Sequence, residues 1–335
     1  MRNKFLNPYF YSVKLERVKE PIPLIGHIAF GIIDRGTNVL QVRPFSNCPM
    51  SCIFCSVDAG PNSRSRVTEY IVDADHLINW VNYIVDRKIH QVSILIDGVG
   101  EPILHPDIVK IVKGIKENRK VFEVAIETHG LPLNERLIKG LANAGLDRIN
   151  LSLDSLDENK AKYLSGHKGY SVSKILKMID LALNEGLKIM LTPVWIKGMN
   201  DEDIINLVKF GKEKGLSFGI QKYVAHPRGR KVAKEVSWKE FKEFLSKIGE
   251  MLDVNLFLSP SQFKVFPDVR LGPVMDVGEK VVGEVVLDGW MKNEVIITAR
   301  GRVITVVGVS DVPKGISLKV KISRNKDEIY LARLS

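Results

Sequence analysis

The chain has 335 residues, of which 45% are hydrophobic and 26% charged, and this globular composition excludes wholesale disorder. Its 49 Lys and Arg against 39 Asp and Glu give a net charge of +10, compatible with a polyanionic partner or with the Lys-rich surface of a thermophile. No apolar run approaches the ~20 residues that span a bilayer, and the first twenty residues lack the apolar core of a signal peptide. We therefore expect a cytoplasmic protein with no membrane partner.

After an N-terminal extension, residues 1–35, short apolar and amphipathic stretches alternate. The apolar runs are rich in β-branched residues, as buried parallel strands are; they cover residues 39–42, 92–96, 122–126, 149–153, 189–194 and 218–223. Helical patterns lie between and after them, at residues 74–85, 106–117, 134–144, 171–185, 201–214 and 238–251. Six strand–helix units are too few for a closed eight-unit barrel, so residues 36–259 are predicted to form a partial (βα)6 barrel in the α/β class.

The pattern changes after a stretch with three prolines, residues 260–273, which we interpret as a linker. Five short alternating strands follow in residues 274–335; they are expected at 280–287, 294–298, 303–307, 317–322 and 329–332. Such spacing is typical of a small all-β barrel of the oligonucleotide-binding kind. We expect this barrel to be tethered by the linker and removable without loss of the chemistry.

The three cysteines of the chain lie within eight residues, Cys48, Cys52 and Cys55, directly after the first predicted strand. Three thiolates in a C-x3-C-x2-C loop can hold three irons of a cubane cluster and leave the fourth iron free to bind a ligand. The alternative is structural zinc, which needs a fourth ligand such as His105 or His129.

Four motifs occur in order, each at the end of a predicted strand. Phe54 precedes the last cysteine; residues 97–102 read Asp-Gly-Val-Gly-Glu-Pro, residues 127–130 Glu-Thr-His-Gly, and residues 150–155 Asn-Leu-Ser-Leu-Asp-Ser. Together they resemble the radical S-adenosylmethionine (SAM) superfamily, with Val99 in place of one glycine of its Gly-Gly-Glu-Pro motif. The resemblance covers residues 36 to about 250.

The resemblance implies a [4Fe–4S] cluster on Cys48, Cys52 and Cys55, with SAM on its open iron. An electron from a low-potential donor such as ferredoxin or flavodoxin would cleave SAM to a 5′-deoxyadenosyl radical, which takes a hydrogen atom from the substrate. The residues expected around SAM are Phe54, Gly98, Gly100, Glu101, Thr128, Ser152 and Asp154. A structural role is expected for Gln221, and the residue that donates or accepts the hydrogen is not predicted.

The absence of further cysteines excludes the members of the superfamily that need auxiliary clusters or extra thiols. Residues 300–333 resemble the TRAM domain, an oligonucleotide-binding barrel of RNA-modifying enzymes, and the basic segments 62–66 and 226–231 are expected to bind phosphates. We therefore predict modification of a nucleoside in tRNA or rRNA. Two alternatives are an enzyme of cofactor or small-molecule biosynthesis with a structural β-domain, and a non-enzymatic RNA-binding protein with a metal knuckle. Aromatic residues near the N-terminus could stack on bases or pack on the barrel: Phe5, Tyr9, Phe10 and Tyr11.

Overall fold

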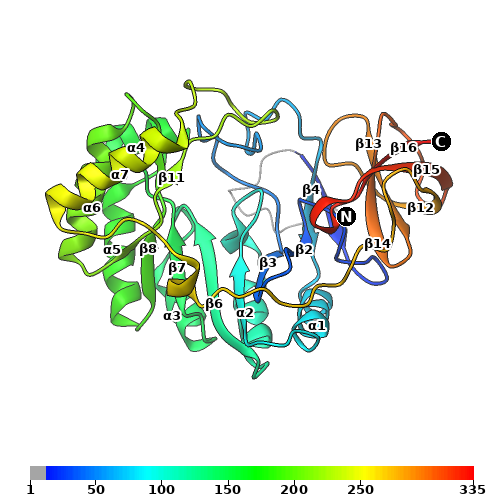
Figure 1. Cartoon of the computed structure of the whole chain (residues 1–335), viewed down its shortest axis with the longest axis horizontal. Coiled ribbons are helices and arrows are strands. Elements are labelled where there is room, and N and C mark those ends of the chain that lie inside the picture. Colours follow the sequence, from blue (N-terminus) through cyan, green and yellow to red (C-terminus); the bar gives the residue numbers. More distant parts are fainter. Residues whose placement is uncertain (1–12) are drawn as a thin grey trace.

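A computed structural model describes residues 13–335, so the four N-terminal aromatic residues lie outside the described part. The chain forms a large curved α/β unit and a small all-β barrel beside it (Figure 1). Within residues 13–335 no helix is both long enough and apolar enough to cross a bilayer.

The large unit is built on a seven-stranded sheet in the order β10-β8-β7-β6-β5-β3-β2. Its six parallel strands, as predicted, are β3 (Val39–Arg43), β5 (Val92–Ile96), β6 (Val121–Thr128), β7 (Arg148–Leu151), β8 (Lys188–Leu191) and β10 (Ser217–Phe218). The antiparallel edge strand β2 (Gly31–Asp34) comes from the segment before residue 36. All six parallel strands end on one side of the sheet, where the sites of such folds lie.

Helices cover the outer face of this sheet (Figure 1). They are α1 (Ala74–Val85), α2 (Ile108–Lys116), α3 (Glu135–Asn143), α4 (Glu158–Ser165), α5 (Val172–Asn184), α6 (Asp201–Glu213) and α7 (Trp238–Leu252). In α2 the buried residues Ile108, Ile111, Val112 and Ile115 follow the 3.6-residue period of one helix face. A short 3₁₀ helix, η1 (Pro102–Leu104), follows β5.

The last two predicted strands are each divided in two. After β8, Pro193 provides no N–H for the ladder, and the chain resumes as β9 (Val194–Trp195). After β10 it resumes as β11 (Gln221–Lys222), which pairs with β9 in parallel. The pair of β9 and β11 therefore follows the main sheet on the side where its parallel strands end.

Sequence periodicity missed two further features, the helix α4 and a parallel pair of strands. The pair consists of β1 (Lys14–Val18) and β4 (Thr68–Val72). Paired residues of these two strands, such as Lys14 and Thr68, lie 54 positions apart in the sequence, so no local turn signal marks them. Buried Tyr70 of β4 donates a hydrogen bond of 2.7 Å to the carbonyl of Asp288, which links the pair to the small barrel.

The stretch predicted as a linker is bonded along the amino ends of the strands (Figure 1). It contains the 3₁₀ helix η2 (Pro260–Phe263), and Asn38 at the start of β3 exchanges backbone and side-chain hydrogen bonds with Phe266. The buried ammonium of Lys88 binds Asp34 at 2.7 Å and also the carbonyl of Val269. The segment therefore closes the base of the large unit.

The small barrel is closed, in the order β12-β13-β14-β16-β15. Its strands are β12 (Lys280–Asp288), β13 (Glu294–Ala299), β14 (Arg302–Val307), β15 (Ser317–Arg324) and β16 (Leu331–Leu334), with the 3₁₀ helix η3 (Lys326–Glu328) before the last. Five strands were predicted in this region. The interior of the barrel has a hydrophobic cluster of its own, separate from the main core of the large unit.

The predicted linker is not the sole connection between the barrel and the large unit. Leu287, Trp290 and Val303 belong to the main hydrophobic core of the large unit. Backbone hydrogen bonds also cross the junction, from Val67 N to the Trp290 carbonyl at 3.0 Å and from Val303 N to the Ile25 carbonyl at 2.9 Å. Removing the barrel would expose part of the shared core, so the two units fold together.

Candidate functional site

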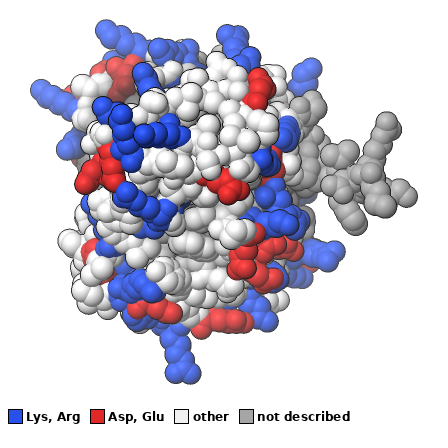
Figure 2. Space-filling model, turned by 90° about the vertical axis from the view of Figure 1, so that its right-hand side faces the viewer, with Lys and Arg blue, Asp and Glu red and all other residues white. Residues whose placement is uncertain are grey.

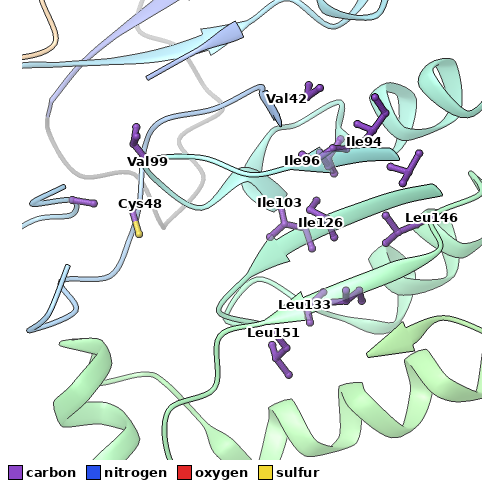
Figure 3. Packing of buried hydrophobic residues seen from close by; sticks show 14 of the residues in the cluster. Val42, Cys48, Ile94, Ile96, Val99, Ile103, Ile126, Leu133, Leu146 and Leu151 are labelled. Atoms are coloured by element: carbon purple, nitrogen blue, oxygen red, sulfur yellow. The ribbon is translucent and has the colours of Figure 1, made fainter. Parts of the chain in front are cut away.

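The cysteine loop joins β3 to β4 and lies beyond the carboxyl ends of the parallel strands. Figure 3 shows Cys48 and Val99 on loops there, apart from Ile96 and Ile126 on the strands. The end of α4 supports the loop, because Ser51 N donates to the Ser165 carbonyl at 3.1 Å. A helix that the sequence analysis missed thus positions the cysteines.

Two buried or half-buried arginines hold the loop from either side. The Arg66 side chain is fully buried, donates to the carbonyls of Ser46, Val57 and Val99, and pairs with Glu69 at 3.0 Å. Arg230 donates to the carbonyls of Cys52 and Ala59 and pairs with Asp58 at 3.1 Å. The expectation that the basic segments 62–66 and 226–231 face phosphates is therefore wrong for these two arginines, because their donors are used internally.

The loop after β5 packs directly against the cysteine loop. A Cβ on Gly100 would lie 2.1 Å from the Ser46 carbonyl oxygen, so only glycine fits there. The next residue, Glu101, donates its N–H to the Asn47 carbonyl at 2.9 Å. Its side chain is fully buried, with Oε2 accepting from His129 N at 3.0 Å and Oε1 without a partner in the described chain. A buried carboxylate oxygen without a partner indicates a ligand group that donates to it.

The Cys48 thiol lies where burial and negative neighbours oppose its ionisation. Burial, then the neighbouring Cys52 and Glu101, raise the pKa of the Cys48 thiol well above its usual value. His129 Nε2 lies 3.6 Å from Cys52 Sγ. Burial works against a charge on His129, but Cys52 and Glu101 raise its pKa well above its usual value. A cationic centre between the thiols would favour their thiolate form.

The zinc alternative does not fit this geometry. Both ring nitrogens of His105 have other partners, the Val72 carbonyl at 2.8 Å and the Asp107 N–H at 3.1 Å. Among residues 13–335, no three His, Cys, Asp or Glu side chains are gathered so as to hold a single metal ion. A cubane instead places each thiolate on a different iron, which needs the sulfurs farther apart.

A cavity of about 290 Å³ opens beside the thiols. It is bounded by all three cysteines and by four of the predicted SAM contacts, Phe54, Gly98, Gly100 and Ser152. It is also bounded by residues that were not predicted to contact SAM, among them Glu127, His129, Val194, Gln221, Tyr223 and His226. The exposed Gln221 thus lies at the cavity, where the sequence analysis expected a structural role.

The other three predicted contacts lie outside the walls of this cavity. Glu101 is buried next to it, as described above. Thr128 Oγ1 accepts from Gly130 N at 3.0 Å, and Asp154 accepts from Val194 N at 2.8 Å. Burial raises the pKa of Asp154 to about 6. Both side chains fix backbone beside the cavity. Asp154 lies beyond the end of β7 at Leu151, so the alternation of a strand does not hold for it.

A second, larger cavity of about 960 Å³ lies where three segments meet. Its walls come from the cysteine loop, from the loop after β11 and from the small barrel; they include Ser51, Asp58, Asn62, Arg64, Arg228, Arg230, Lys231, Met291, Lys292 and Glu294. Arg228 pairs with buried Glu294 at 3.4 Å. Arg64, Lys231 and Lys292 are exposed and form no ion pair with another described residue.

The fold, the cysteine loop and the strand-end motifs define a class of enzyme, and the comparison with known families agrees. The radical SAM superfamily model matches residues 42–211, and the chain belongs to this superfamily. Its members are enzymes that use a [4Fe–4S] cluster and SAM together with a reductant. Family membership excludes the alternative of a non-enzymatic RNA-binding protein.

Among its relatives, the uncharacterized protein MJ0103 of Methanocaldococcus jannaschii is 36% identical over 95% of this chain and 80% of its own length. The GTP 3′,8-cyclase of Campylobacter jejuni subsp. doylei is 33% identical over 54% of either chain, so the present chain spans about half of that relative. SuiB of Streptococcus suis, solved with its precursor peptide SuiA, is similar in fold, with a TM-score of 0.53, 21% identity, and coverage of 67% of this chain and 48% of SuiB.

The residues present fit the cofactors of the superfamily. Three thiols on one loop meet at a cavity. The partnerless Glu101 Oε1 suits an ammonium group such as that of SAM, and Asn47 Oδ1 is a second buried acceptor without a partner among the described residues. The chemistry supplied by the cluster and SAM is reductive formation of a radical that abstracts hydrogen.

Proposed function

We propose that Cys48, Cys52 and Cys55 bind the cluster and that SAM binds in the adjoining cavity. Phe54, Gly98, Gly100 and Ser152 line the cavity, and Glu101 offers its free oxygen to the SAM ammonium. Thr128 and Asp154 contribute by fixing the backbone at Gly130 and Val194. The electron donor is a low-potential ferredoxin or flavodoxin.

We propose further that this enzyme modifies a nucleoside in RNA, in tRNA or rRNA. The observation that carries this proposal is the second cavity, which adjoins the cysteine loop and has three exposed cations that form no ion pair within residues 13–335, Arg64, Lys231 and Lys292. Each cation comes from a different segment, so a ligand held by all three would contact the cysteine loop, the loop after β11 and the small barrel together. Phosphates of a nucleic-acid backbone are suited to such a site, because they repeat negative charge along the chain.

The charges on the outer face of the small barrel also favour the second cavity as the location of the RNA phosphates. Figure 2 shows Lys and Arg interspersed with Asp and Glu over this face. A mixed surface gives little long-range attraction for a polyanion. We therefore place the phosphate contacts in the cavity between the barrel and the cysteine loop, and not on the exposed surface of the barrel.

A second candidate function is chemistry on a free nucleotide in cofactor biosynthesis. The observation that favours it is the similarity to GTP 3′,8-cyclases over about half of the chain. In that case the cations of the second cavity would hold the phosphates of one nucleotide. The two candidates differ in the number of phosphates bound and in the size of the ligand.

The experiment that tests the RNA proposal is a salt series of RNA binding. Protein reconstituted without oxygen is titrated with bulk tRNA, and Lys231→Ala and Lys292→Ala are compared with the wild type. Each variant should weaken binding and lower the slope of log affinity against log salt by roughly one unit or less. Lys113→Ala is the matched control, because Lys113 is exposed on α2 and lies outside both cavities.

A competition with GTP separates the two candidates. We expect GTP to displace tRNA at micromolar concentrations if the substrate is a free nucleotide. In that case Lys231→Ala and Lys292→Ala should lose GTP binding as strongly as tRNA binding, and this result would favour the free-nucleotide function. If the variants bind tRNA as tightly as the wild type does over the whole salt series, the proposed RNA site is wrong.

A further inference from the structure

His129 lies next to the sulfur atom of one of the three cysteines. It directly follows the last residue of β6, and its Nε2 atom is 3.6 Å from Cys52 Sγ. Its other ring nitrogen, Nδ1, is 3.7 Å from Glu101 Oε2. A cysteine that binds iron is a thiolate, and thiolates and carboxylates accept hydrogen bonds without donating any. The ring therefore lies between two acceptors and acts as a donor toward them.

The backbone of His129 is held on both sides. Its N–H donates to Glu101 Oε2 at 3.0 Å, and its carbonyl accepts from the hydroxyl of Tyr170 at 2.8 Å. Tyr170 is buried, so this second bond lies away from solvent. Because the point of attachment of the ring is fixed, the approach of Nε2 to Cys52 is a feature of the fold itself.

Each of the three cysteine sulfurs has a nitrogen donor, but the donors differ in kind. Cys55 Sγ accepts from the backbone N–H of Ala59 at 3.2 Å, and Cys48 likewise has a backbone donor. The hydrogen bond to Cys52 comes from a side chain. A backbone donor is present whichever residue occupies the position, whereas a side-chain donor depends on the residue. The amino acid at position 129 therefore decides how the Cys52 sulfur is hydrogen-bonded.

We propose that His129 raises the reduction potential of the [4Fe–4S] cluster by donating a hydrogen bond to its ligand Cys52, an inference that rests on the proposed cluster site. Reduction adds one negative charge to the cluster and its ligands, and hydrogen bonds to the sulfurs stabilise that charge. The electron comes from the ferredoxin or flavodoxin proposed above. At a given potential of this donor, His129 increases the share of the enzyme that is reduced. It acts through Cys52 and is not itself a catalytic residue.

The test is a redox titration of the reconstituted protein without SAM, in which electron paramagnetic resonance measures the reduced cluster. His129→Leu removes the donor. At the midpoint potential of the wild type, its ratio of reduced to oxidised cluster should be about tenfold lower, which corresponds to about 59 mV for one electron.

Two amide variants separate the hydrogen bond from the size of the side chain. His129→Gln and His129→Asn carry the same amide group on side chains of different length. The longer Gln side chain can place its N–H near the position of Nε2, so its ratio should stay within about threefold of the wild type, as a neutral donor is weaker than a charged one. The Asn side chain is shorter, so this variant should behave like His129→Leu.

His226→Leu is the matched control. His226 lines the same cavity, and within residues 13–335 its side chain forms no hydrogen bond with a cysteine. The midpoint potential of this variant should equal that of the wild type. Iron analysis accompanies each titration, and the iron content of all variants should match that of the wild type.

The outcomes separate this inference from the proposals on which it depends. A wild type that binds no cluster would contradict the cluster site itself. With the cluster present, equal midpoint potentials of the wild type and His129→Leu would overturn the role of His129, and a loss of SAM affinity in that variant would then make it a SAM contact. If His129→Leu fails to bind iron, equal potentials of the Gln and Asn variants would overturn the proposal, and so would loss of iron in all three variants. No substrate is used, so failure of the RNA proposal leaves this inference standing.

Discussion

Arg64 and Arg66 lie two residues apart in one basic segment, and the structure assigns them opposite roles. The Arg66 side chain is fully buried and paired with Glu69. Arg64 is exposed at the second cavity, its backbone N–H donates to Asp58, and its side chain forms no ion pair with another described residue. Replacing each by alanine should therefore separate stability from RNA binding.

The magnitude for Arg66→Ala follows from what the substitution leaves behind. Removing one partner of a buried ion pair costs about 3–5 kcal/mol, because the remaining charge stays buried. Three backbone carbonyls also lose their donor, and the guanidinium no longer lies 4.6 Å from the ring centre of Trp290. Since 1 kcal/mol moves the Tm of a large domain by roughly 2 °C, we expect Tm to fall by roughly 6–10 °C.

Thermal unfolding followed by circular dichroism measures the change in Tm, and a tRNA-binding titration measures the change in RNA affinity. Arg64→Ala should leave Tm within about 1 °C and reduce RNA affinity, with a lower salt slope. An Arg66→Ala variant as stable as the wild type would refute the reasoning about the buried pair. An Arg64→Ala variant with unchanged RNA affinity would refute the role of the second cavity.

Four other changes test the site and the junction. Reconstituted wild type should contain about four irons per chain and Cys48→Ala far fewer, by elemental analysis; stoichiometric zinc without iron would contradict the cluster. Gly100→Ala places a Cβ 2.1 Å from the Ser46 carbonyl oxygen, so we expect a displaced cysteine loop and a lower iron content. A normal iron content in this variant would contradict the packing argument. Trp290→Ala should lower the free energy of unfolding by about 3–5 kcal/mol, measured by urea unfolding. Deletion of residues 274–335 should leave no cooperatively folded protein. A stable truncated protein would show that the shared core is dispensable.

Much of the fold could be predicted from the sequence because its signals are local. The parallel strands are short β-branched runs, and the helices between them carry an apolar face with a capping side chain, as Asn134 caps α3. The pair of β1 and β4 could not be predicted, because residues far apart in the chain form it. The division between β8 and β9 could have been predicted from Pro193 itself.

For the site, the cysteine motif predicted the loop, and strand-end motifs predicted four residues of the cavity wall. Sequence spacing could not separate Arg64 from Arg66, because burial depends on Trp290 and Glu69, which reach the loop only in the folded chain.

The central claim is that this radical SAM enzyme modifies a nucleoside in RNA. The measurement that tests it most directly is a mass-spectrometric comparison of nucleosides from tRNA and rRNA of cells with and without the gene. We expect one modified nucleoside to be absent without the gene, and to return with the wild-type chain but not with Cys48→Ala. Identical nucleoside profiles in both strains would contradict the claim and favour a free nucleotide as the substrate.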